Sequence, residues 1–196
     1  NPRWKRAFDQ MQSQTRRMNA LVNDLLLLSR LENEKSIAKN QIIEMPSLMN
    51  QLFDDAQAYN VDYGHTLNLD IDSHCEIIGS DMELASAFSN LITNAIKYTP
   101  KGGTITIGWH DDGTHGYFTV EDTGIGIDPK HLPRLTERFY RVDSARSRAT
   151  GGTGLGLAIV KHVLMQHNAY LEVESKENQG SIFKAVFPKE RLFHSS

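Results

Sequence analysis

The sequence predicts an α/β fold: a two-layer sandwich, with helices on one face of a mixed sheet, preceded by one long helix. Three observations support this class. Runs with the period of strands and runs with the period of helices are interspersed from about residue 40 onward. A turn signal, Asp111-Asp112-Gly113, joins two of the strand-like runs into a hairpin. Residues 3–33 contain neither glycine nor proline and carry a helical apolar stripe.

Composition limits the classes of protein to which the chain can belong. Its 196 residues suffice for one full-sized domain plus a smaller element, and 39% apolar and 23% charged residues are typical of a soluble globular chain. A net charge of -3 argues against nucleic-acid binding through bulk electrostatics. Because Cys75 is the single cysteine, an intramolecular disulfide and a cysteine-based zinc site are excluded. No apolar run approaches the roughly 20 residues of a membrane span, and no signal peptide opens the chain.

The apolar stripe of residues 3–33 recurs in alternating steps of four and three. Its members are Trp4, Phe8, Met11, Thr15, Met18, Val22 and Leu25. This spacing predicts a heptad-like helix of roughly 45 Å at 1.5 Å per residue. Such a helix cannot bury its stripe alone, so it either folds back on its own domain or joins a bundle, which its length and heptad spacing favour. Residues 32–36 break the pattern and divide the chain into a helical unit, 1–35, and a domain, 36–196.

The rest of the chain combines short strands with amphipathic helices. Strands are predicted at 40–44, 66–71, 75–78, 104–109, 117–121, 170–175 and 181–187, and helices at 46–58, 81–97 and 154–167. Residues 123–152 show little pattern of either kind. A loop of that length in a compact domain is typically a functional lid or a disordered segment.

A glycine-rich stretch, residues 150–157, leads directly into the last predicted helix. Four of its eight residues are glycine. Glycines ahead of a helix allow a close approach to an anion, and the free N–H groups of the helix end favour phosphate. A flexible loop with a convenient N-cap is the alternative. A Walker A loop is excluded because Leu157 follows Gly156, and a dinucleotide fingerprint is excluded because no strand directly precedes the glycines.

A second polar segment lies on the helix predicted at 81–97. Its members on one side of that helix and just beyond it are Asn90, Asn94, Lys97 and Tyr98. Two amides, an ammonium group and an aromatic ring on one face suit a metal–phosphate group with a base nearby. Amides on the solvent face of a helix are the alternative for the two asparagines.

Two further segments complete the polar set. Asp122 is a carboxylate at a strand end, followed by Gly124 and Gly126. It can accept a hydrogen bond from an exocyclic amine of the kind that adenine offers, or it can form an Asx-turn. The other segment is rich in arginine, whose fork matches phosphate oxygens. Its cations are Lys130, Arg134, Arg138, Arg141, Arg146 and Arg148.

In order and spacing, these segments resemble the N, G1, F and G2 boxes of the catalytic domain of sensor histidine kinases. That domain belongs to the superfamily of gyrase, the Hsp90 chaperone and the MutL repair protein. The boxes are 90–98, 122–126, 138–141 and 152–156. The resemblance covers about 41–188 and implies a Bergerat-type ATP-binding fold, and the run 133–148 is most similar to phosphate-regulon sensor kinases. One departure is Thr136, which replaces the phenylalanine that usually anchors the start of the lid.

The resemblance implies a role for each matching position. Asn94 would coordinate Mg²⁺, with Asn90 close to the metal. Lys97 and Arg141 would contact phosphates, and Asp122 would read the adenine amino group. Further nucleotide contacts are implied for Tyr98, Gly124, Gly126, Ile127, Tyr140, Gly152, Thr153, Gly154, Leu155, Gly156, Leu157 and Ser181, and catalytic roles for Asn90, Lys97 and Arg141. The implied cofactors are ATP and Mg²⁺.

The side chain at position 90 indicates which acceptor receives the phosphoryl group, and here it is the amide of Asn90. Related ATPases of the superfamily carry a glutamate there that activates water, and an amide cannot act as that base. The resemblance therefore implies that the γ-phosphoryl group is kept for a protein histidine and then relayed to an aspartate of a response regulator. An ATP hydrolase or serine kinase on the same fold and a nucleotide-regulated dimerisation module are the alternatives.

None of the eight histidines fits the acceptor motif, in which histidine and an acidic residue precede a proline by a few positions. Residues 3–33 instead resemble the second helix of the dimerisation and phosphotransfer hairpin, without the first. We therefore expect a cytoplasmic fragment that binds Mg·ATP without phosphorylating itself. Its parent would be a homodimeric kinase, anchored in the bacterial inner membrane, that serves phosphate-starvation signalling. We also expect the lid, 123–152, to become ordered when nucleotide binds.

Overall fold

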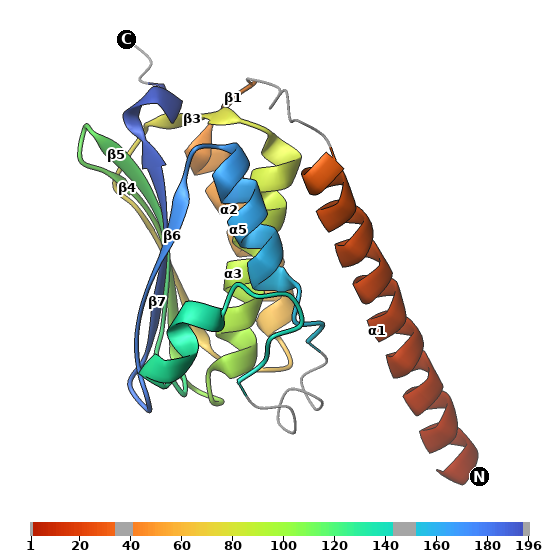
Figure 1. Cartoon of the computed structure of the whole chain (residues 1–196). Coiled ribbons are helices and arrows are strands. Elements are labelled where there is room, and N and C mark those ends of the chain that lie inside the picture. The colour runs from red at the N-terminus through yellow and green to blue at the C-terminus, as the bar shows by residue number, and fades with distance from the viewer. Residues whose placement is uncertain (1, 34–40, 143–151, 194–196) are drawn as a thin grey trace.

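The computed structural model describes residues 2–33, 41–142 and 152–193 of the chain. Figure 1 shows a twisted sheet, helices that cover one of its faces, and one long helix outside them. The helices are α1 (Pro2–Asn33), α2 (Met45–Asn60), α3 (Asp81–Tyr98) and α5 (Gly156–Gln166), with two short 3-10 helices, η1 (Pro129–Arg134) and η2 (Lys189–Arg191). The strands are β1 (Gln41–Ile43), β2 (Thr66–Ile71), β3 (Glu76–Gly79), β4 (Thr104–Asp111), β5 (His115–Asp122), β6 (Tyr170–Lys176), β7 (Gly180–Pro188) and β8 (Leu192–Phe193). The predicted α/β sandwich is confirmed.

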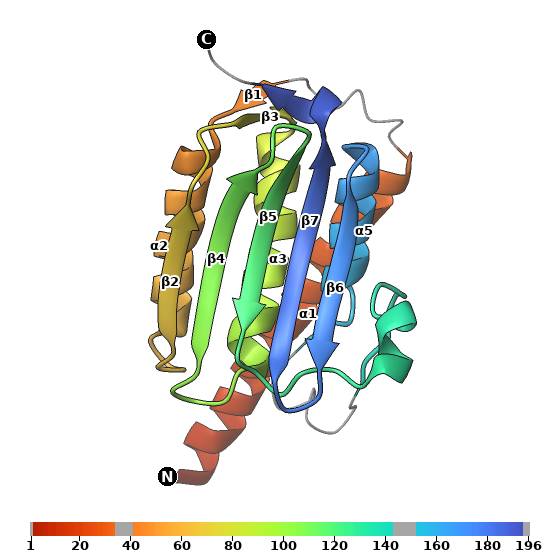
Figure 2. The same ribbon diagram turned by 90° about the vertical axis from the view of Figure 1, so that its left-hand side faces the viewer.

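The main sheet has five strands in the order β2-β4-β5-β7-β6. Strand β2 runs parallel to β4, and the other neighbouring pairs are antiparallel, so the sheet is mixed, as expected. Helices α2, α3 and α5 all lie behind this sheet in Figure 2. The register of β5 against β7 pairs Asp122 with Ser181. Two residues of the predicted site, far apart in the sequence, therefore meet at one end of the sheet.

A second, smaller sheet with the order β1-β3-β8 closes one end of the sandwich (Figure 2). The sequence predicted β1 and β3 as members of one sheet with the other strands, and it did not predict β8. Strand β8 is two residues long, too short for a period of its own, and is defined by its antiparallel pairing with β3.

The core lies between the main sheet and the helices on its face. Phe88 of α3 is fully buried and stacks on Phe118 of β5 with ring centroids 3.8 Å apart, while Phe187 of β7 meets it edge-on at 6.1 Å. Trp109 of β4 is also fully buried, and its indole N–H donates to the carbonyl of Cys75 at 3.0 Å. These rings fix α3 on the central strands, so the polar side of α3 has a fixed position as well.

Helix α1 packs on the domain near its own C-terminal end, where Leu28 and Leu31 are buried and α1 contacts α5. Toward the N-terminus its stripe is open, because Trp4 is 75% and Met18 is 66% exposed. Figure 1 shows this part of α1 extending past the domain. The fold-back alternative therefore applies to the last turns of α1, and the open stripe is consistent with the bundle alternative. Within the described ranges, no helix has the length and hydropathy needed to cross a membrane.

The stretch 123–152 contains η1, which the sequence did not predict. Asp128 caps η1 by accepting the N–H of Lys130 at 3.0 Å, and Pro129 opens it. Residues 143–151, which include Arg146 and Arg148, lie outside the described residues, so the ordering of the lid by nucleotide stays a prediction. Helix α1 continues to Asn33 and residues 34–40 are not described, so the division into units 1–35 and 36–196 also stays a prediction.

Phe88 provides a test of the core. Phe88→Ala removes a fully buried ring that contacts two others, so it should lower the free energy of unfolding by about 3–5 kcal/mol. Met82→Ala, on the exposed side of the same helix, should change that energy by less than about 0.5 kcal/mol. Urea unfolding followed by circular dichroism measures both. A loss below about 1 kcal/mol for Phe88→Ala would contradict the central place of this contact.

Candidate functional site

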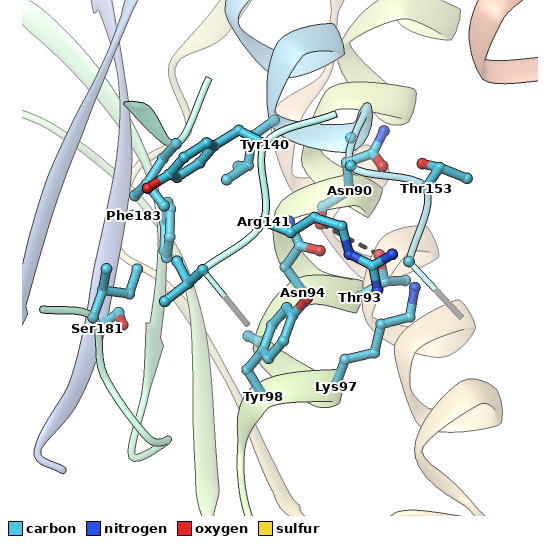
Figure 3. A pocket seen from close by; sticks show the side chains of 18 of the residues that line it. Asn90, Thr93, Asn94, Lys97, Tyr98, Tyr140, Arg141, Thr153, Ser181 and Phe183 are labelled. Atoms are coloured by element: carbon cyan, nitrogen blue, oxygen red, sulfur yellow. Dashed lines mark hydrogen bonds between the residues drawn. The ribbon is translucent and has the colours of Figure 1, made fainter. Parts of the chain in front are cut away.

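A cavity of about 340 Å³ opens between α3, the end of β5, the first part of the lid, the glycine stretch and α1. Most of the predicted site residues line it: Asn90, Asn94, Lys97, Tyr98, Asp122, Gly126, Ile127, Tyr140, Arg141, Gly152, Thr153, Gly154, Gly156, Leu157 and Ser181. In Figure 3, Asn90, Asn94 and Lys97 project from α3 on one side of the cavity, and Ser181 lies on the other side. The four boxes, which are separate in the sequence, therefore form one site in space.

Two predicted residues do not line the cavity. Leu155 is fully buried and packs in the hydrophobic core, so it anchors the glycine stretch to the domain. Gly124 stands behind Asp122, and its N–H donates to Asp122 Oδ1 at 2.8 Å. A Cβ at position 124 would lie 2.5 Å from that oxygen and 2.7 Å from the carbonyl oxygen of Tyr98. Gly124 thus shapes the cavity by allowing this close approach.

The cavity also has walls that the sequence did not predict. These are Ala20 and Asp24 of α1, Thr93 and Ala95 of α3, Ile125, Leu135, Val142, and Phe183 of β7. Thr93 lies three positions after Asn90 on the same helix, so helical spacing alone could have identified it. The residues of α1 carry no such local signal, because their position depends on how α1 docks on the domain.

One end of the cavity holds a buried carboxylate. Asp122 is 6% exposed, and burial raises the pKa of its carboxyl to about 6, although hydrogen bonds from the backbone of Gly124 and Ser181 act in the opposite direction. Ser181 is 7% exposed, and its hydroxyl lies 2.9 Å from the hydroxyl of Ser175. This end therefore offers a fixed hydrogen-bond acceptor in apolar surroundings, which suits a neutral ligand group with an N–H to donate.

The other end of the cavity is cationic. Burial lowers the pKa of Lys97, and the carboxylate of Asp24 offsets part of that shift. Atom Nη2 of Arg141 is buried and has no hydrogen-bond partner among the described residues. In Figure 3 the side chains of Lys97 and Arg141 both extend toward the side of the cavity that holds Thr153. Desolvated cations with unused donors are suited to an anion with several oxygens, such as phosphate.

Between the two ends lie the amides of α3. The amide Nδ2 of Asn90 donates to the carbonyl of Ser86 at 2.9 Å. Its Oδ1 faces the start of α5, since a Cβ at Gly156 would lie 2.7 Å from that oxygen. The glycine there lets α5 begin directly against Asn90, so a carboxamide oxygen lies beside the N-terminus of α5. Both groups suit a phosphate with a bound cation.

The first part of the lid is anchored on two sides. Phe139 has a left-handed backbone with φ 61°, and its N–H donates to the carbonyl of Gly154 at 2.8 Å. Gly154 itself has φ 76°, and a Cβ there would lie 2.9 Å from the Cα of Phe139. On the other side, the hydroxyl of Tyr140 lies 2.6 Å from Nδ1 of His131, and the Arg134 guanidinium lies 4.2 Å from the centroid of the Tyr140 ring. These contacts hold the residues around Tyr140 although Thr136 supplies no ring.

Comparison of sequences identifies relatives among sensor proteins. The chain is 53% identical over 187 residues to the phosphate regulon sensor protein PhoR of Pseudomonas aeruginosa and 43% identical over 191 residues to PhoR of Haemophilus influenzae. These matches cover 95% and 96% of this chain but 42% and 44% of the two relatives. The chain therefore spans less than half of their length.

Solved structures share the fold. The crystal structure of full-length ShkA in complex with AMPPNP matches with a TM-score of 0.79 at 25% identity, over 93% of this chain and 38% of that one. The histidine kinase AdeS of Acinetobacter baumannii matches with a TM-score of 0.77 at 21% identity, over 94% of this chain and 84% of that one, which supports the fold alone.

The family of histidine kinase-, DNA gyrase B- and HSP90-like ATPases matches residues 79–191, which is more than half of the chain. This region includes α3, β5, the described part of the lid and the glycine stretch, so it contains all the predicted boxes. The two PhoR relatives match almost the whole chain. The chain belongs to the family of histidine kinase-, DNA gyrase B- and HSP90-like ATPases.

Proposed function

We propose that the chain is the ATP-binding catalytic domain of a two-component sensor histidine kinase, which holds Mg·ATP in the cavity and delivers the γ-phosphoryl group to a histidine. The observation that carries this proposal is that the two ends of the cavity differ in charge. The buried carboxylate of Asp122 forms one end, and Lys97 and Arg141 form the other. Membership of an ATPase family supports ATP as the nucleotide that spans the two.

Asp122 would read the base. Its carboxylate is oriented by the N–H of Gly124 and lies in apolar surroundings, where a hydrogen bond from an exocyclic amine is strong. Adenine carries such an amine at its six-position. Guanine carries a carbonyl there, whose oxygen would face the carboxylate with no proton between them. Ser181, the cross-strand neighbour of Asp122, would hold a bridging water to the same base.

The phosphates would lie toward Lys97, Arg141 and the glycine stretch. An unpartnered buried guanidinium nitrogen is costly, and a phosphate oxygen would satisfy it. Asn94 would be the protein ligand of Mg²⁺, with Asn90 close by, because Mg²⁺ takes few protein ligands and relies on substrate phosphates. In the parts of the chain that the structure describes, no three or more His, Cys, Asp and Glu side chains are grouped so that they could hold a metal ion. The bound ion would neutralise part of the phosphate charge.

The residues around the phosphates suit transfer to a protein better than hydrolysis. Transfer of a phosphoryl group needs chiefly positioning and stabilisation of charge, which Lys97 and Arg141 would supply. Hydrolysis needs in addition a base for water. Asn90 cannot take a proton, and its Nδ2 is already engaged by the carbonyl of Ser86.

The phosphoryl acceptor would be a histidine on a helix that these 196 residues do not supply, and α1 would be the second helix of the same hairpin. The exposed apolar stripe of α1 supports this, since it suits a bundle formed by two copies of the parent kinase. The phosphoryl group would pass on to the receiver domain of a response regulator. Similarity to two proteins that are named as phosphate regulon sensors supports a role in phosphate-starvation signalling.

Asp122→Asn tests the base-binding end of the cavity. The charge-assisted hydrogen bond is lost, so the Kd for a fluorescent ATP analogue should rise by about ten- to a hundredfold. Asp70→Asn removes a charge from the exposed face of β2 and should leave the Kd unchanged. An Asp122→Asn Kd within about twofold of the wild-type value would contradict the adenine assignment.

The raised pKa of Asp122, about 6, adds a test by pH. The ionised carboxylate accepts the amino hydrogen bond more strongly than the protonated carboxyl does, so wild-type affinity should fall by up to about tenfold from pH 7 to pH 5. The phosphates of the ligand also titrate in this range, so Asp122→Asn serves as the control that reports their share. Because the folded pKa lies above the usual value of 3.8, ionisation costs stability as pH rises from about 4 to about 6. The Asn variant should therefore be no less stable than the wild type at neutral pH, and an equal pH dependence of binding in both proteins would contradict this role.

Incubation with γ-labelled ATP tests the direction of transfer. The chain alone should remain unlabelled, because none of its histidines fits the acceptor motif. The histidine-bearing hairpin of the parent kinase, supplied in trans, should become labelled with acid-labile phosphate, and Arg141→Ala should reduce this transfer at least about tenfold. Acid-labile label on the chain itself would contradict the acceptor assignment. Steady-state release of phosphate in place of transfer would identify an ATP hydrolase.

A further inference from the structure

Helix α1 brings a carboxylate to the cationic end of the cavity. Asp24 lines the cavity, and its Oδ2 accepts a hydrogen bond from the hydroxyl of Thr153 at 2.8 Å. The same hydroxyl accepts the N–H of Leu155 at 3.2 Å, just ahead of α5. Asp24 is thus joined to the glycine stretch, although 129 positions separate the two hydrogen-bonded residues in the sequence.

The position of Asp24 follows from the docking of α1. Leu28 and Leu31, four and seven positions later, lie on the same face of the helix and are buried on the domain. The side-chain amide of Gln166, at the end of α5, donates to the carbonyl of Leu31. These contacts fix the rotation of α1 about its axis, so the carboxylate one turn before Leu28 faces the cavity whenever α1 is docked.

Asp24 occupies surroundings that suit an anion. It is the charged group that acts on Lys97, and Arg141 Nη2 in the same cavity has no partner within the described residues. The glycine stretch and the start of α5 add N–H groups that favour negative charge. The carboxylate of Asp24 accepts its hydrogen bond from Thr153 and leaves Arg141 Nη2 unused, and its negative charge repels any phosphate brought close to it.

We propose that Asp24 is a charge-selecting residue of the nucleotide site: while α1 is docked, its carboxylate disfavours each added phosphate, so triphosphate binding and α1 docking oppose each other. The inference rests on the proposed function, because it concerns the phosphate end of the nucleotide site. Coupling between two binding events is reciprocal, so a triphosphate in the cavity weakens the docking of α1 by the same factor by which docking weakens the triphosphate.

Two other roles for Asp24 predict different outcomes. If Asp24 were a ligand of Mg²⁺, removing its charge would weaken Mg·ATP binding. If Asp24 only oriented Thr153, its loss would weaken the binding of ADP and ATP, because Thr153 belongs to the glycine stretch at the phosphate end of the site. A repulsive carboxylate instead predicts a gain in affinity that grows with the charge of the ligand.

The experiment compares Asp24→Asn with wild type in titrations of the whole 196-residue chain with adenosine, ADP and ATP at fixed Mg²⁺ and low salt. Asp24→Asn should bind ATP about tenfold more tightly, ADP by a smaller factor and adenosine with unchanged affinity. The gain for ATP should shrink at about 1 M salt, where the Debye length is about 3 Å. Asp55→Asn, which removes an exposed carboxylate of α2 outside the cavity, should leave all three affinities unchanged.

A second variant tests the same coupling and changes no residue that lines the cavity. Leu31→Ala weakens the docking of α1 and should also raise ATP affinity, and Asp24→Asn should then add little in the Leu31→Ala background. Weaker ATP binding by Asp24→Asn, or an equal change for all three ligands, would overturn the proposal. If wild type and variants bind adenosine but Asp24→Asn has no effect on ATP, this inference alone fails. If the wild type binds none of the three ligands, the proposed function fails with it.

Discussion

The junction between the end of β5 and the C-terminal end of α3 is the constraint on which the rest of the site depends. Asp122 is the last residue of β5, and the N–H of Ile125 donates to the carbonyl of Tyr98 at 3.2 Å. Only a glycine fits at 124, because a Cβ there would collide with Oδ1 of Asp122 and with the carbonyl oxygen of Tyr98. The stacked rings of Phe88 and Phe118 hold the same helix on the same strand from within the core. A buried carboxylate and a polar helix face therefore share one cavity.

The two ends of the cavity differ in chemistry because different elements of the fold form them. Asp122 is buried at the end of β5 where that strand pairs with β7, and this burial raises the pKa of its carboxyl. At the other end of the cavity, Nη2 of Arg141 has no hydrogen-bond partner among the described residues, and between the two ends α5 begins against Asn90. A ligand with a neutral hydrogen-bond donor at one end and negative charge at the other fits in a single orientation. The proposed function and the role of Asp24 both follow from this polarity.

The sequence predicted the parts whose signal is local. The buried face of α3 has a helical period, the main strands have clear alternation, and the boxes have recognisable spacing, so most of the residues that line the cavity were identified. The remaining features depend on contacts between distant segments. Strand β8 exists through pairing with β3, Tyr140 is held by His131, and Asp24 reaches the cavity only because Leu28 and Leu31 dock α1 on α5. No period or motif near Asp24 indicates this position.

A crystal structure of the chain with Mg²⁺ and a non-hydrolysable ATP analogue would show directly how the nucleotide is oriented in the cavity. The proposed binding mode places the amino group of the base within hydrogen-bonding distance of Asp122 and the terminal phosphate against Arg141 or Lys97. A nucleotide bound in the reverse orientation, or outside this cavity, would contradict it.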